Sequence, residues 1–220
     1  TTPGKWQIVK SRNSEMAYEG QYGKLNWNLT VKTSQSMSEN SFEITDTFRA
    51  PKVDNNTVAD TDLHYALLGE LDQALKNGMT LFYTKLDGGV YTSGTLSWAQ
   101  LKAYTEGNSK IQVTYSYYAD EAGTQEITDT PETSPNTHVK SFKIKVKWNA
   151  DQMVTQININ NYKTYVDVTK LEAGKDWLIP NELSVDRLTD SVRIHIGETI
   201  AISISWWMTI RGTLTRTIRQ

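Results

Sequence analysis

The side chains best suited to catalysis or metal binding are three histidines, and their spacing argues against both roles. His64, His138 and His195 lie far apart in the chain. None stands in an HExxH or HxH pattern that would bring two of them to one metal ion. We therefore expect each histidine to be exposed or hydrogen-bonded within the fold. The sequence has no cysteine, which excludes disulfides, thiolate metal sites and cysteine nucleophiles.

Asp54, Asp60 and Asp62 offer carboxylates that could bind calcium. Their spacing lacks the glycine and the final glutamate of an EF-hand loop, so helix capping in a solvated loop is the simpler interpretation. The sequence contains neither a GxSxG nucleophile elbow nor a phosphate-binding glycine loop. We expect a chain that is not an enzyme and that holds no metal and no cofactor.

Lys10, Asp46 and Asn136 offer chemistry of a structural kind. Lys10 lies in the first expected strand, Asp46 lies in FEITDTF, and Asn136 lies in a loop before a lysine-rich strand. A lysine removed from water becomes a neutral nucleophile, and a buried acid polarises an amide.

The stretch from LNWNLTVK to FEITDTF resembles domains of Gram-positive surface adhesins and pilins. In those families a lysine and an asparagine join as an isopeptide, and a nearby carboxylate relays the proton. The resemblance implies a crosslink between Lys10 and Asn136 assisted by Asp46. The alternative is that Lys10 is an ordinary solvent-facing lysine.

The elements that must position these residues are mostly strands, because apolar and polar residues alternate along most of the chain. The clearest examples are YGKLNWNLTVKT, SFEITDTF and HVKSFKIKVKWN. Helical spacing occurs over Asp60–Asn77 and in SWAQLKAY, where Ser97 and Gln100 have capping-box spacing; ELSVDRL is a third, shorter candidate. We predict an all-β, antiparallel, jelly-roll-like β-sandwich with one or two inserted short helices. It forms a single domain over residues 1–220, with a possible boundary near 120–138.

Two surface features could carry binding or modification. Lys143, Lys145 and Lys147 form a basic face that could bind acidic polysaccharide, DNA or lipid, or could protect an edge strand from unwanted pairing. Asn28 and Asn55 match the glycosylation pattern, which matters only in an exported chain. The net charge of −2 gives no general argument for nucleic acid, and no apolar run is long enough to span a bilayer.

The N-terminal segment poses a pairing problem, because a strand is expected over Lys5–Lys10 and no turn folds it directly back. The order of elements over residues 1–149 resembles the TasA/camelysin family of secreted biofilm-matrix proteins and their archaeal pilus relatives. In their filaments the N-terminal strand of one subunit inserts into the sheet of the next. The resemblance implies a donor strand made of Lys5, Trp6, Gln7, Ile8, Val9 and Lys10. The alternative is that this segment is the first strand of its own sandwich.

The sequence thus predicts a secreted, cell-surface structural protein. Our first hypothesis is a subunit of a pilus or biofilm-matrix fibre, whose partner is a further copy of itself in a head-to-tail homopolymer. The second is an adhesin or carbohydrate-binding module that recognises a surface polysaccharide or a host ligand. The third is a jelly-roll structural protein of a virus. We expect no nucleic-acid partner and no membrane span.

Overall fold

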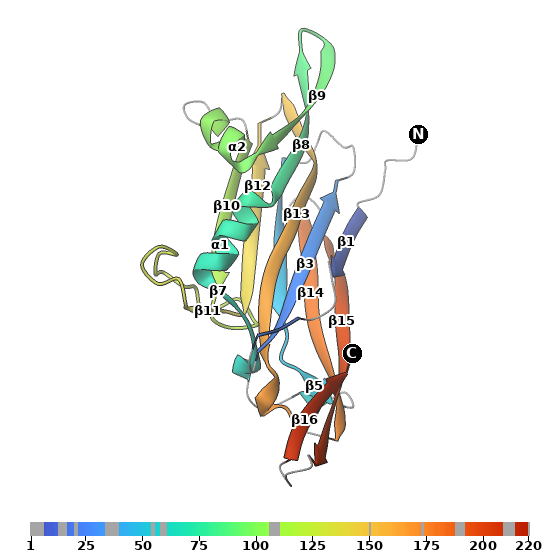
Figure 1. The fold of residues 1–220 in the computed structure, drawn as a ribbon. Coiled ribbons are helices and arrows are strands. Elements are labelled where there is room, and N and C mark those ends of the chain that lie inside the picture. The colour runs from blue at the N-terminus through green and yellow to red at the C-terminus, as the bar shows by residue number, and fades with distance from the viewer. Residues whose placement is uncertain are drawn as a thin grey trace.

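The computed structural model describes residues 7–12, 17–19, 22–33, 40–53, 56–57, 61–105, 111–149, 151–172, 174–187, 192–208 and 214–219. Two antiparallel sheets pack face to face and run almost the whole length of the molecule (Figure 1). Two short α-helices, α1 (Leu68–Asn77) and α2 (Trp98–Thr105), lie along one side. The prediction of an all-β sandwich with one or two short helices is confirmed. The single-domain organisation stays a prediction.

The first sheet has the order β1-β3-β13-β7-β11, with β2 beside β3 and the pair β8–β9 beside β13. Its strands are β1 (Gln7–Arg12), β2 (Ala17–Glu19), β3 (Tyr22–Lys32), β7 (His64–Leu67), β8 (Met79–Asp87), β9 (Val90–Ser97), β11 (His138–Val139) and β13 (Gln152–Asp167).

The second sheet has the order β10-β12-β4-β14-β15-β16, with the short pair β5–β6 beside β14. Its strands are β4 (Ser41–Phe48), β5 (Lys52–Val53), β6 (Asn56–Thr57), β10 (Ile111–Tyr118), β12 (Ser141–Trp148), β14 (Lys175–Arg187), β15 (Val192–Met208) and β16 (Leu214–Arg219). Short 3-10 turns, η1 (Thr61–Leu63) and η2 (Val168–Lys170), complete the elements.

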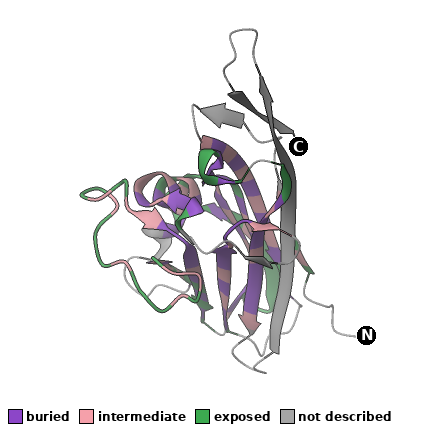
Figure 2. Cartoon of the chain, turned by 90° about the horizontal axis from the view of Figure 1, so that it is seen from below, coloured by how far each residue is buried: buried purple, intermediate pink, exposed green. Residues whose placement is uncertain are grey.

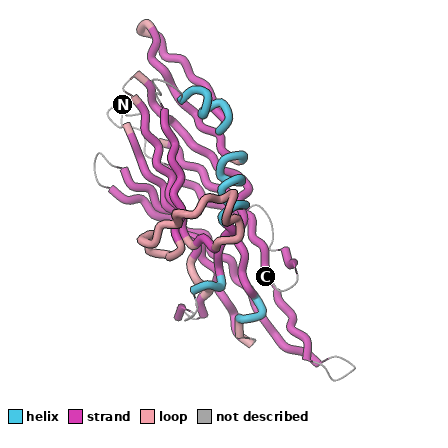
Figure 3. Tube along the Cα trace, turned by 90° about the vertical axis from the view of Figure 1, so that its left-hand side faces the viewer, coloured by secondary structure: helices cyan, strands magenta, loops and turns pink. Residues whose placement is uncertain are grey.

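The core lies between the sheets and follows from the alternation in the sequence. Alternate residues of β3 and β4 are fully buried, and Figure 2 shows such bands of buried residues along the strands. Burial removes these apolar side chains from water, which is the main force that holds the sheets together. Figure 3 shows the long loop between β10 and β11 folded against one side of the sandwich.

The N-terminal segment pairs within its own sheet in this structure. Strand β1 is antiparallel to β3, with Ile8 opposite Val31 and Lys10 opposite Leu29. Strand β2 pairs with the same edge of β3, so the chain runs along that edge before it turns into β3. Gln7 and Val9 are exposed, whereas Ile8 packs against the core. The predicted strand begins earlier, at Lys5 and Trp6, which lie outside the described residues.

Two of the predicted helices are wrong at least in part. The expected helix over Asp60–Asn77 begins only at Leu68, because His64 and Tyr65 pair with β13 instead. ELSVDRL is part of β14, which is hydrogen-bonded on both sides by β4 and β15. In both places pairing with neighbouring strands outweighs local helical spacing.

The capping box before α2 is present. The Ser97 N–H donates to Gln100 Oε1 over 2.9 Å, and the Gln100 N–H donates to Ser97 Oγ over 3.3 Å. The helix SWAQLKAY therefore begins where the sequence places it.

A β-bulge in β13 decides which of its side chains enter the core. Ile157 and Ile159 are buried, Asn160 and Asn161 are both exposed, and Tyr162 is buried again. Asn161 has a φ of 71°, and its N–H donates to the side-chain oxygen of Asn28 over 3.0 Å. The extra residue shifts the inward positions from odd to even numbers, because side chains in a strand alternate between faces.

Gly78, at the end of α1, allows the helix to lie against this bulge. A Cβ at residue 78 would lie 2.2 Å from the carbonyl oxygen of Asn160, and the Gly78 carbonyl accepts the Asn160 N–H over 3.0 Å. We expect Gly78→Ala to destabilise the fold by about 1–3 kcal/mol, because backbone must move to admit the methyl group. Denaturant unfolding measures this change.

Gly88→Asn is the matched control, because residue 88 has open space around it and a φ of 57° that asparagine tolerates. Equal unfolding midpoints for the two variants would contradict the tight packing at Gly78.

Candidate functional site

A lysine and an aspartate from opposite sheets meet in the core. Lys10 comes from β1 and Asp46 from β4, and the lysine Nζ donates to Asp46 Oδ2 over 3.1 Å. Both side chains are fully removed from solvent. The alternation explains how they arrive there, because Lys10 shares the inward face of Ile8, and Asp46 shares that of Ile44 and Phe48.

Tyr162 of β13 completes the contact. Its hydroxyl donates to Asp46 Oδ2 over 2.7 Å and accepts a hydrogen bond from Lys10 Nζ. The lysine Nζ also lies 4.8 Å from the ring centre of Tyr162 and 5.0 Å from that of Trp27. The amine thus lies beside two aromatic rings and contacts the Asp46 carboxylate.

Asn181 lies next to this group, on β14. Its strand pairs with β4, where Asn181 is opposite Phe48 and Leu183 is opposite Asp46. The side chain is fully buried, and its amide lies close enough to the Asp46 carboxyl to lower that group's pKa. Among the described residues, neither the oxygen nor the nitrogen of this amide has a hydrogen-bond partner of ordinary geometry, and the same holds for Asp46 Oδ1. Unpaired polar atoms in a core are rare and often mark a functional site.

The charge state of the group follows from its burial. Burial raises the pKa of Asp46, and this effect outweighs the opposing influence of Lys10, Tyr162 and Asn181. A raised pKa favours transfer of the proton from the ammonium of Lys10 to the carboxylate. Burial also raises the pKa of Tyr162 far above its usual range, so its hydroxyl keeps its proton.

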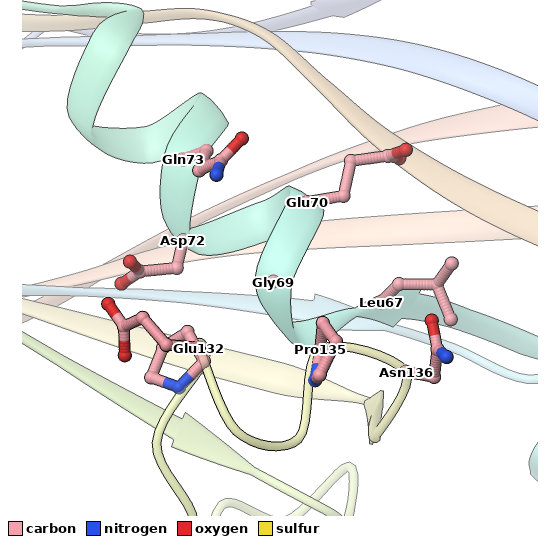
Figure 4. Close-up of a pocket in the computed structure, with 9 residues that line it drawn as sticks. Leu67, Gly69, Glu70, Asp72, Gln73, Glu132, Pro135 and Asn136 are labelled. Carbon is pink, nitrogen blue, oxygen red and sulfur yellow. The ribbon is translucent and has the colours of Figure 1, made fainter.

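The structure brings together Lys10 and Asp46 but does not bring Asn136 to them, and the predicted set is corrected here. Asn136 is exposed and lines a pocket of about 470 Å³ beside the start of α1, together with Gly69 and Pro135 (Figure 4). An exposed side chain on that loop cannot reach an amine that is buried between the sheets. Asn181 is the asparagine that lies beside Asp46 instead, and the sequence analysis did not single it out because no strand was expected over residues 175–187.

The contacts of His64 and His138 involve other residues. His64 is buried, with Nδ1 donating to the Arg49 carbonyl over 2.8 Å and Nε2 accepting from Thr164 Oγ1 over 2.9 Å. His138 contacts Asp62 over 3.0 Å and stacks on Tyr65. The side chain of His195 is not among those described.

The predicted calcium ligands are not brought together in the described part of the chain. Asp62 contacts Lys140 over 3.2 Å as well as His138, and Asp54 and Asp60 lie outside the described residues. Among described residues, no group of three or more histidine, aspartate or glutamate side chains is placed to hold a metal ion.

The predicted surface features lie on the sheets. Lys145 and Lys147 are exposed on β12, and Lys143 lies 4.7 Å from the ring centre of Tyr118. Strand β12 lies between β10 and β4, so protection of an edge strand does not explain these lysines. Asn28 is half-buried and holds the β13 bulge, and Asn55 lies outside the described residues.

Comparison with known proteins gives no family. No family model and no curated protein matches the sequence. Among solved structures, the chain is similar to the major pilin SpaD of Corynebacterium diphtheriae, with 5% identity and a TM-score of 0.35 over 90% of this chain and 36% of that one. It is similar to the adhesin CfaE of enterotoxigenic E. coli, with 12% identity and a TM-score of 0.27 over 90% of this chain and 48% of that one.

These solved chains are longer, and this chain spans between about a third and a half of each. With TM-scores this low, the functional proposal depends on the side chains of the site alone. In the described part of the chain, no helix is long and apolar enough to cross a membrane.

The burial of His64 predicts a pH dependence of stability. Burial lowers the pKa of His64 to about 4, from 6.5. Between these values the unfolded chain binds a proton that the folded chain does not, so the free energy of unfolding should fall as the pH falls from 6.5 to 4. A shift of this size corresponds to about 3 kcal/mol. Denaturant unfolding at a series of pH values measures the slope.

His64→Gln should remove this part of the slope, whereas His138→Gln, at a half-buried histidine, should keep it. The same slope in both variants would show that another group is responsible.

Proposed function

We propose that this chain is a structural β-sandwich of an extracellular surface fibre or adhesin, held together by an isopeptide bond that forms spontaneously between Lys10 and Asn181. The observation that carries this proposal is the buried group around Asp46, where the Lys10 amine donates to the carboxyl and the Asn181 amide, which has no hydrogen-bond partner of ordinary geometry among the described residues, lies beside the same carboxyl. Such an arrangement would only destabilise an ordinary core, because burying unpaired polar groups and charges raises the free energy of the folded state.

The reaction needs nothing beyond these three side chains. Lys10 gives its proton to Asp46, and its nitrogen then attacks the amide carbon of Asn181 while the acid donates a hydrogen bond to the amide oxygen. A proton passes from the attacking nitrogen, through Asp46, to the amide nitrogen of Asn181. The bond between that nitrogen and the amide carbon breaks, and ammonia leaves. A primary amide and an amine become a secondary amide and ammonia, so all atoms balance.

The crosslinked product also has fewer unfavourable polar groups in the core than the unlinked side chains. The buried charges disappear, and the unpaired amide of Asn181 is replaced by a secondary amide whose carbonyl accepts from Asp46. The crosslink joins the first described strand to β14 and so ties the two sheets covalently. Such a bond suits a protein that must stay folded outside the cell under mechanical or chemical stress, and the chain needs no cysteine for it.

The mass of the intact chain tests the crosslink. We expect the wild-type chain to be lighter than its sequence by one ammonia, and Lys10→Ala, Asp46→Ala and Asn181→Ala each to have the full mass. Asn136→Ala is the matched control and should lose ammonia like the wild type. Full mass in the folded wild type, or an unlinked Asn136→Ala variant, would contradict the proposal.

The crosslink should also raise stability, because it closes a covalent loop between residues 10 and 181 in the unfolded chain. In the chain-entropy description, a loop of this length stabilises the fold by about 5 kcal/mol. We expect Asn181→Ala to lower the free energy of unfolding by at least this amount, measured with guanidinium. A smaller effect in a chain shown by its mass to be crosslinked would show that the entropy of the loop is not the main contribution.

Within this proposal, head-to-tail filaments with an exchanged N-terminal strand remain our detailed hypothesis. Lys10 makes it testable, because a β1 strand supplied by a neighbour would bring its lysine to Asp46 and Asn181 of the next copy. We expect ladders of covalent oligomers in denaturing gels after assembly at high concentration, and none from Lys10→Ala. Monomers alone, each lighter by one ammonia, would show that β1 stays in its own chain and would leave the intramolecular crosslink intact.

A further inference from the structure

The hydroxyl of Tyr162 contacts both Lys10 and Asp46, and a tyrosine that only fills space in the core would not require these contacts. It accepts from Lys10 Nζ and donates to Asp46 Oδ2 over 2.7 Å, so it links the two reacting partners of the proposed crosslink. Its ring packs edge-on against Phe142, with 5.6 Å between ring centres. The ring alone would fill this space, and a phenylalanine would fill it without burying a hydroxyl.

The hydrogen bonds of Tyr162 make the two oxygens of Asp46 different. Oδ2 accepts from both Lys10 and Tyr162, whereas Oδ1 has no partner of ordinary geometry in the part of the chain that the structure describes. The amide of Asn181 likewise has no partner of ordinary geometry among the described residues, and it lies close enough to the same carboxyl to lower its pKa. With Oδ2 already occupied, Oδ1 is the oxygen that is left to hold a proton and to donate to the Asn181 amide.

The same hydroxyl orients the amine. A neutral amine has one lone pair, which must point at the amide carbon for attack to occur. Donation of an N–H to Tyr162 and the rings of Trp27 and Tyr162 limit the directions in which this lone pair can point.

The β-bulge in β13 turns the side chain of Tyr162 toward the core. Without the extra residue at Asn161, continued alternation from Ile159 would bury residues 161 and 163 and would turn Tyr162 outward. The bulge is held by Asn28 on one side and by the contact with Gly78 on the other. Three separate features of the chain therefore place this one side chain.

We propose that Tyr162 is a positioning residue of the crosslinking reaction, which fixes the Lys10 amine and leaves Asp46 Oδ1 for the amide of Asn181. This inference rests on the proposed crosslink, and it assigns to Tyr162 an effect on the rate of the reaction rather than on the fold. Tyr162 takes no part in the covalent change, because its hydroxyl begins and ends with its proton.

The test compares Tyr162→Phe with Tyr165→Phe. Tyr165 is on the same strand, is also buried, and its hydroxyl also donates to a carboxylate, that of Glu70 over 2.8 Å. Each chain is made by cell-free synthesis, samples are denatured at intervals, and the fraction that has lost ammonia is read from the intact mass. Circular dichroism confirms that both variants fold.

We expect Tyr162→Phe to crosslink about ten-fold more slowly or worse, which is the effect of one lost hydrogen bond, and Tyr165→Phe to match the wild type. The pH profile separates positioning from packing. The hydrogen bond from Tyr162 lowers the pKa of Asp46, so its loss should move the alkaline fall in rate, where Asp46 loses its proton, to higher pH. A role in packing alone would leave the position of that fall unchanged.

An unchanged rate and pH profile in Tyr162→Phe would overturn this inference while the crosslink itself stands. A wild-type chain that never loses ammonia would instead overturn the proposed function. If Tyr162→Phe does not fold, a fluorinated tyrosine at residue 162 replaces it. That residue keeps the shape and donates more strongly, so the alkaline fall should move to lower pH, and an unmoved fall would contradict the inference.

Discussion

The contact between Lys10 and Asp46 joins the two sheets at a point closed to solvent, and the surrounding core is arranged around it. Taking two charges out of water is unfavourable unless their geometry is good and their remaining polar atoms are satisfied. Here Tyr162 donates to Asp46 Oδ2, but Asp46 Oδ1 and the Asn181 amide have no hydrogen-bond partner of ordinary geometry among the described residues. Some buried polar atoms of this group therefore lack hydrogen-bond partners. The neutral secondary amide of the proposed crosslink would remove the two buried charges and pair these atoms.

Four strands must be in their native register for this group to form. Strand β1 supplies Lys10, β4 supplies Asp46, β14 supplies Asn181, and β13 supplies Tyr162 only because its bulge reverses the alternation. Strand β4 lies directly beside β14, whereas β1 and β13 approach from the opposite sheet on either side of β3. Closing the sandwich is thus the step that assembles the site, since no single sheet contains both the amine and the amide.

Sequence alternation predicted the sandwich, and a family resemblance singled out Lys10 and Asp46. The alternation also contains the reason for their burial, because both share the parity of their apolar neighbours, but the sequence analysis left a solvent-facing Lys10 open. It could not place Asn181, because KLEAGKDW was expected to be turn-like and ELSVDRL helical, whereas pairing with β4 and β15 makes residues 175–187 one strand. The burial of the Tyr162 side chain could not be predicted from the sequence either. It depends on the left-handed backbone conformation of Asn161 and on a hydrogen bond to Asn28 on another strand. The same limit applies to His64–Leu67, where pairing across the sheet replaced a helix.

The positions of Lys10 and Asn181 near opposite ends of the chain have a consequence for proteolysis. Once they are joined, residues 10 to 181 form a closed covalent ring, and the segment that contains β15 and β16 continues from it as a tail. A protease that cuts a loop inside the ring, such as the exposed turn at Gly88 or the long loop before β11, would open the ring without releasing a fragment. Both halves would stay attached and packed, so the protein would survive a single cut in most of its length.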